Sequence, residues 1–185
     1  MAATDSSITP QRAREDRAIY RAMRLLENRM RTPGELMHSS SAVRQFLTLH
    51  LAQKEREIFT ALWLDAQHRV IVADDLFLGT LTETTVHPRE VLKRALQLNA
   101  AAVIFAHNHP SGCAEPSYSD KWLTDVLKRA LAVIEVQVLD HVIVAGASTL
   151  SLAERGMLDD EQPKAQPETK RRRAHPRKAA QAATA

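Results

Sequence analysis

The sequence predicts a globular α/β protein in which a mixed sheet is flanked by helices. Short apolar runs typical of buried strands alternate along the chain with longer stretches whose apolar residues recur at helical spacing. Hydrophobic residues make up 44% of the 185 positions, which is enough for one domain with a sizeable core. No apolar run approaches the roughly 20 residues that a membrane span needs, so no membrane partner is expected.

The first half of the chain predicts two helices and two strands. Residues 12–31 form an amphipathic stretch, which predicts a helix that packs on the domain or on a partner. Residues 41–51 predict a second helix with an apolar inner face. Two apolar runs, 57–64 and 69–77, then predict strands joined by a turn at 65–68.

The second half predicts alternating helices and strands. Residues 88–98 predict a helix, since proline suits its first position. The apolar run 101–105 predicts a buried strand, which Pro110 and Gly112 end by turning the chain. A helical stripe follows an N-cap at Ser117. Residues 136–144 predict a strand buried on both faces, where the lone His141 is expected to be a hydrogen-bonded core residue. A short hairpin and a turn end the domain.

Candidate metal ligands are concentrated between the strand at 101–105 and the following helix. His107 and His109 are two residues apart, so an extended backbone points both imidazoles the same way. Asp120 lies in the first turn of the helix, which brings its carboxylate back toward them. Two imidazole nitrogens and one carboxylate suit zinc in an open, catalytic site with water in the fourth position.

Other interpretations of these residues remain open. Ser117 and Asp120 also fit a capping box, a structural role, and the two histidines could be solvated loop residues. Cys113 could be a fourth ligand that closes the site. Adjacent His-Asn-His is weak evidence for an HNH nuclease, which spreads its histidines over a longer unit. Zinc deaminase chemistry needs a Pro-Cys-x-x-Cys set that a single cysteine does not supply.

The spacing of these residues resembles a known metal motif. His107-x-His109, ten intervening residues and Asp120, with Ser117 three before the aspartate, resemble the motif of the MPN/JAMM zinc metalloprotease superfamily. The phrase His-Asn-His-Pro-Ser-Gly at 107–112 resembles the bacterial RadC family in particular. Further matches are His-Pro-Arg-Glu at 87–90, Leu-Asp-His at 139–141 and Ser-Leu-Ala-Glu-Arg-Gly at 151–156.

The resemblance covers about residues 40 to 158 and implies a cytidine-deaminase-like MPN/JAMM fold with one zinc ion per chain. It implies that an upstream glutamate activates water at the metal. Glu57 is the better candidate because it directly precedes the strand, whereas Glu55 is expected to be a solvated charge. The Ser117 hydroxyl would stabilise the oxyanion of the tetrahedral intermediate.

The implied activity is zinc-dependent hydrolysis of a peptide or isopeptide amide in a protein or peptide substrate. The rival interpretation is a DNA-associated accessory protein with a structural or vestigial metal site, because the RadC family carries a DNA-repair label. Its longer members have an N-terminal helix-hairpin-helix region. This chain is short there and is expected to lack that region.

Charge divides the chain into unlike parts. Residues 164–178 carry a net charge of +6 from seven Lys/Arg and one Glu, whereas the whole chain carries +3, so the rest carries −3. We therefore predict an N-terminal helical extension (1–35), a RadC-like domain (36–158) and a disordered basic tail (159–185) that could bind nucleic acid weakly and non-specifically through phosphates. The N-terminus lacks a secretory pattern and one cysteine excludes an internal disulfide, so a cytoplasmic location is expected.

Overall fold

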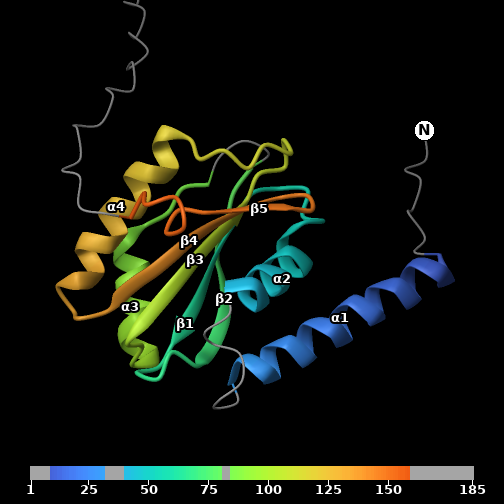
Figure 1. The fold of residues 1–185 in the computed structure, drawn as a ribbon, viewed down its shortest axis with the longest axis horizontal. Helices are drawn as coiled ribbons and strands as arrows, with labels where there is room; N and C mark the ends of the chain where they lie inside the picture. Colours follow the sequence, from blue (N-terminus) through green and yellow to red (C-terminus); the bar gives the residue numbers. More distant parts are fainter. Residues whose placement is uncertain (1–8, 32–39, 81–83, 159–185) are drawn as a thin grey trace, which may run out of the picture.

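A five-stranded mixed sheet with helices on both faces forms the centre of the protein (Figure 1). The computed structural model describes residues 9–31, 40–80 and 84–158. The helices are α1 (Pro10–Arg31), α2 (Ser40–Leu51), α3 (Pro88–Leu98) and α4 (Tyr118–Ala132). The strands are β1 (Ile58–Leu64), β2 (Val70–Leu78), β3 (Ala102–Asn108), β4 (Gln137–Ala145) and β5 (Ser148–Ser151). The predicted α/β class with a mixed sheet is confirmed.

The strand order is β2-β1-β3-β4-β5, and the pairing places β3 at the centre. β1 runs antiparallel to both β2 and β3, and β5 runs antiparallel to β4. β3 and β4 run parallel, so the chain must cross over between them, and α4 makes that crossover. The carboxyl end of β3 therefore leads directly into the segment that begins α4.

Each face of the sheet has its own apolar core. On one face, α2 packs against the sheet, and Met23 and Leu26 of α1 pack against the same cluster. On the other face, α3 and α4 cover a second cluster centred on Phe59, Trp63 and Phe105. Figure 1 shows α3 and α4 on one side of the sheet and α1 and α2 on the other. Successive residues of β3 alternate between the two faces.

The predicted helices agree with the structure to within two residues at the ends that the structure describes. The central strand extends past the apolar run at 101–105 to Asn108, and it ends just before Pro110, as the sequence predicts. His107 is paired with Phe59 on one side and Ile143 on the other. Neighbouring strands therefore hold this polar residue inside the sheet.

Other predictions concern residues outside the described ranges. The basic tail at 159–185 and its nucleic-acid binding stay predictions, as does the division of the chain at residues 35 and 158. Within the described ranges, no helix is long and apolar enough to cross a membrane.

Candidate metal centre

Two histidines at the end of β3 turn their rings toward the α3–α4 face. His107 is buried in the strand, and the backbone N–H of His109 donates to the carbonyl of Val144 at 2.8 Å, which continues the pairing with β4 for one more residue. The extended backbone places both side chains on one side. Their Nε2 atoms lie 2.9 Å apart, so the two rings converge as the sequence predicts.

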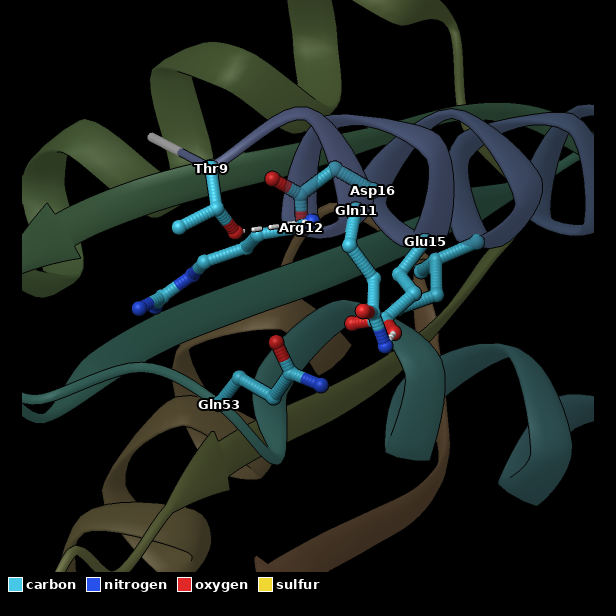
Figure 2. A pocket seen from close by; sticks show the side chains of 7 residues that line it. Thr9, Gln11, Arg12, Glu15, Asp16 and Gln53 are labelled. Atoms are coloured by element: carbon cyan, nitrogen blue, oxygen red, sulfur yellow. Dashed lines mark hydrogen bonds between the residues drawn. The ribbon is translucent and has the colours of Figure 1, made fainter. Parts of the chain in front are cut away.

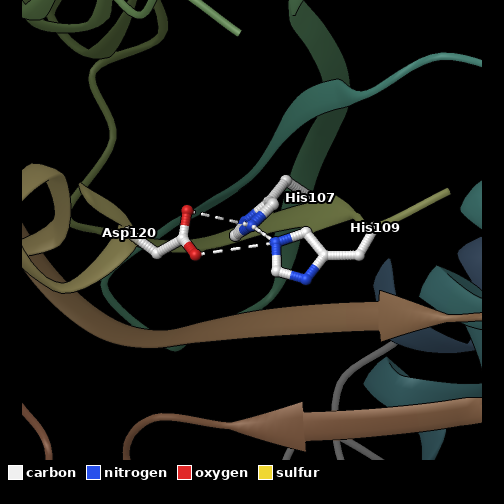
Figure 3. A group of neighbouring side chains, drawn as sticks. All are labelled: His107, His109 and Asp120. Carbon is white, nitrogen blue, oxygen red and sulfur yellow. Dashed lines mark hydrogen bonds and ion pairs between the residues drawn. The ribbon is translucent and has the colours of Figure 1, made fainter. Parts of the chain in front are cut away.

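Asp120 reaches the histidines from the first turn of α4. Its backbone N–H donates to the Ser117 hydroxyl at 3.1 Å, and its Oδ2 accepts the Ser117 backbone N–H at 2.7 Å. The capping box is therefore present, and it fixes the carboxylate. The same carboxylate lies 3.3 Å from Nε2 of His107 and 3.5 Å from Nε2 of His109 (Figure 3). The capping role and the role beside the histidines coexist in one side chain.

These three side chains could hold a metal ion. One ligand atom from each lies within 4.8 Å of the others. Among the described residues, no other group of three or more His, Cys, Asp or Glu residues meets this criterion. Two imidazole nitrogens and a carboxylate oxygen leave a fourth tetrahedral position free for water or substrate. The thiol of Cys113 is not part of the group. Instead, the carbonyl of Cys113 lies 2.7 Å from Nδ1 of His109.

The electrostatics of the centre favour a charged carboxylate. Burial acts to raise the pKa of Asp120, but the hydrogen bonds with His107, His109 and Ser117 and the attraction of His107 together outweigh it and hold that pKa well below its usual value. The hydrogen bond with Asp120 raises the pKa of His109, against the opposing effect of burial. A negative oxygen facing two imidazoles is the charge arrangement that a divalent cation complements, because the cation replaces the protons shared among them.

A second layer of polar residues lies behind His107. His141 of β4 is fully buried, and its Nε2 lies 2.8 Å from Nδ1 of His107. Its Nδ1 lies 2.5 Å from the hydroxyl of Thr124, which in turn lies 2.6 Å from the backbone carbonyl of Asp120. Burial lowers the pKa of His141 well below its usual value. His141 is thus a hydrogen-bonded core histidine, as the sequence predicts.

Glu57 lies immediately before β1 and is half-buried, whereas Glu55 is exposed. The negative charge of Glu57 contributes to the raised pKa of His109, after the hydrogen bonds with Asp120 and Cys113. Asn108 fixes the segment that carries Glu57. Its side-chain oxygen accepts the backbone N–H of Ile58 at 2.8 Å, and its amide donates to the carbonyls of Lys54 and Arg56 at 3.2 and 3.0 Å. The residue between the two histidines therefore ties the Glu57 segment to β3.

A shallow cavity elsewhere on the surface has no part in this centre. Its volume is about 420 Å³, and it lies between the start of α1 and Gln53 (Figure 2). Its lining is mostly polar and includes Arg12, Glu15 and Asp16. None of the three candidate ligands lines it, and the chemistry of the centre does not extend to it.

Comparison with known proteins agrees with the motif. The family model of the RadC-like JAB domain matches residues 37–157, which is more than half of the chain. The chain belongs to the RadC family. UPF0758 protein YkfG of Escherichia coli is 50% identical over 151 residues, which cover 82% of this chain and 94% of that protein.

Other RadC-family relatives are longer than the matched region. A UPF0758 protein of Nitrosospira multiformis is 56% identical over 74% of this chain and 61% of its own length. One from Leptothrix cholodnii is 61% identical over 65% of this chain and 54% of its own length. The match with this chain spans less than two thirds of these two relatives. The shared region contains the JAB domain, which is of the MPN/JAB hydrolase type at the level of the family.

Sequence reasoning missed three residues of this RadC-family site. The functional roles of Asn108 and Thr124 were not predicted, and His141 was predicted only as a core residue. Thr124 follows Asp120 by four positions in a helix, a spacing that could have indicated its hydrogen bond to the Asp120 carbonyl. The other two act across strands, through contacts 34 and 50 residues apart in sequence, for which the local pattern gives no signal.

Proposed function

We propose that this protein is a zinc-dependent hydrolase of the JAMM type that cleaves a peptide or isopeptide amide. The observation that carries the proposal is the convergence of His107 Nε2, His109 Nε2 and the Asp120 carboxylate at the end of β3. This donor set fits zinc with one position open, as in catalytic rather than structural sites. Membership of the RadC-like JAB family supports the same reaction class.

Each residue has a distinct task in the proposed reaction. Zinc in this site supplies Lewis acidity and makes water a nucleophile near neutral pH. Glu57 accepts a proton from the attacking water at its carboxylate and later passes it to the leaving nitrogen. The Ser117 hydroxyl donates to the developing oxyanion. The cap does not require the hydroxyl hydrogen, because it uses the Ser117 oxygen as an acceptor.

The placement of Glu57 supports its task. It is half-buried, and its charge contributes to the raised pKa of His109, whereas the neighbouring Glu55 is exposed. Asn108 limits the freedom of the segment through three hydrogen bonds and is adjacent in sequence to both ligand histidines. A proton acceptor must be held close to the water that it activates, so a fixed segment at this position suits general base catalysis.

The test compares zinc-loaded wild type with Glu57→Gln and with Glu55→Gln as the matched control. Each protein is incubated with a mixture of proteome-derived peptides and isopeptide-linked peptides, and mass spectrometry counts new amino termini. We expect wild type and Glu55→Gln to cleave the same bonds, and Glu57→Gln to cleave them about 10²–10⁴-fold more slowly while zinc stays bound. Cleavage by no protein, or equal cleavage by all three, would contradict the proposal.

A further inference from the structure

The two candidate ligand histidines are held from behind in different ways. The Nδ1 atom of His109 faces the carbonyl of Cys113 at 2.7 Å. A carbonyl oxygen can only accept, so Nδ1 of His109 carries the hydrogen. The Nδ1 atom of His107 faces another imidazole, His141, at 2.8 Å. An imidazole nitrogen can donate or accept, so this contact alone does not show which of the two rings carries the hydrogen. The hydrogen-bond partner on the other side of His141 has to fix it.

The backbone carbonyl of Asp120 fixes the direction of the hydrogen bonds in this chain. Its carbonyl oxygen lies 2.6 Å from the Thr124 hydroxyl and cannot donate, so the single hydroxyl hydrogen of Thr124 points to it. The Thr124 oxygen must then act as the acceptor for Nδ1 of His141, 2.5 Å away. The hydrogen of the neutral His141 ring is therefore on Nδ1, which leaves its Nε2 as an acceptor.

Burial selects the neutral form of His141. The residue is fully buried, among the rings of Phe59 and Phe105, and its two ring nitrogens are bonded to Thr124 and His107. No carboxylate contacts either nitrogen within the described residues, so a charged ring would lack direct compensation. Because its Nε2 accepts, Nδ1 of His107 must donate. This leaves Nε2 of His107, which faces Asp120 and His109, as the ring nitrogen available to a metal ion.

We propose that Thr124 and His141 are positioning residues that fix His107 as the Nδ1–H tautomer and so present its Nε2 lone pair to a metal ion. The chain of hydrogen bonds starts at the backbone of one candidate ligand, Asp120, and ends on the ring of another, His107. This chain orients the buried ring of His107 in the same way that the hydrogen bond to the Cys113 carbonyl orients the ring of His109. This inference rests on the metal binding in the proposed function, but its hydrogen-bond order exists without the metal.

Metal-free protein tests the hydrogen-bond order directly. Long-range ¹H–¹⁵N correlation spectra of the histidine rings distinguish a protonated from a bare ring nitrogen. We expect Nδ1 of both His107 and His141 to carry hydrogen in the wild type. In Thr124→Val, which removes the hydroxyl at nearly constant volume, His107 is expected to populate both tautomers. Thr124→Ser keeps the hydroxyl and should give the wild-type spectrum. A His107 ring with a bare Nδ1 in the wild type would overturn the inference.

Zinc affinity, measured by competition with a chelating dye, gives a second readout. Loss of a hydrogen bond behind a ligand typically weakens metal binding about 10–100-fold, which we expect for Thr124→Val and not for Thr124→Ser. Equal affinity of the two variants would overturn the inference. A wild type with the expected tautomers that binds no zinc would support the hydrogen-bond order and refute the proposed hydrolase, so the two failures are distinguishable.

Discussion

Histidine meets aspartate on both faces of the sheet, and the two clusters are built differently. On the α1–α2 face, Nε2 of His50 lies 2.7 Å from Oδ1 of Asp75. The same oxygen accepts the hydroxyl of Thr60 at 2.7 Å. On the α3–α4 face, His107 and His109 both direct Nε2 toward Asp120. The first cluster has one imidazole, stacked on Phe46, and the second has two.

The difference lies in where the hydrogens are held. In the His50 cluster, Oδ1 of Asp75 is already satisfied by donors of the protein itself. In the His107 cluster, hydrogen-bond acceptors behind the rings hold the hydrogens on the Nδ1 atoms, so the Nε2 atoms converge in front as candidate ligands. A histidine and an aspartate in contact therefore form a hydrogen-bonded pair in one place and part of a candidate ligand set in the other.

The largest expected contrast is stabilisation by zinc. At a free zinc concentration about 100 times the dissociation constant, binding stabilises the folded protein by about 2.7 kcal/mol. We expect His109→Ala to abolish this gain and His50→Ala to retain it, because only His109 belongs to the ligand set. Thermal unfolding with and without zinc measures the gain. An equal loss in both variants would remove the distinction between the clusters.

A smaller effect is expected at Asp75, in acid. Burial acts to raise the pKa of Asp75, but the hydrogen bonds with His50 and Thr60 and the nearby positive charges of His50 and Lys54 together outweigh it, and the pKa lies below its usual value. A lowered carboxyl pKa contributes stability above the unfolded-state value of about 3.9, and this is lost as pH falls through the folded-state pKa.

The change Asp75→Asn should therefore lower the free energy of unfolding by about 1–2 kcal/mol at pH 7. The difference from wild type should shrink as pH falls below about 4. Urea unfolding at several pH values measures it. Zinc affinity should stay at the wild-type value, and a fall in that affinity would show that the two clusters are coupled through the sheet.

The smallest expected effect is at Ser117, where two substitutions distinguish its N-cap role from its proposed role in catalysis. Replacing a serine N-cap costs about 1 kcal/mol with alanine but only a few tenths with glycine. Ser117→Ala should be the less stable variant, while both lack the hydroxyl and should lose the same amount of activity. Urea denaturation and the cleavage assay give the two readouts. Wild-type activity in Ser117→Gly would limit Ser117 to the cap.

Local sequence predicted most of the elements and the convergence of the three candidate ligands, because these depend on short-range rules. Proline at the first position predicted α3 at 88–98, and the i, i+2 spacing predicted the converging rings of His107 and His109. The cap at Ser117 and the position of Asp120 followed from the N-terminal signals of a helix.

The support behind the ligands depends on contacts between distant strands. The parallel register of β3 and β4 pairs Phe105 with His141, and this brings the His141 ring to His107. Nothing in residues 136–144 alone fixes that register. The partners that hold His107 in the sheet likewise lie on other strands, β1 and β4. Pairing between distant strands thus fixed the positions of His107 and His141, which the local sequence pattern left undetermined.

Zinc content measured by inductively coupled plasma mass spectrometry tests the central claim most directly. The samples are purified wild type, His107→Ala and Asp120→Ala, with His50→Ala and Asp75→Asn as matched controls from the opposite face. We expect about one zinc per chain in the wild type and in both controls, and loss of zinc in the two ligand variants. No zinc in the wild type after reconstitution, or equal loss in ligand variants and controls, would contradict a metal centre at the end of β3.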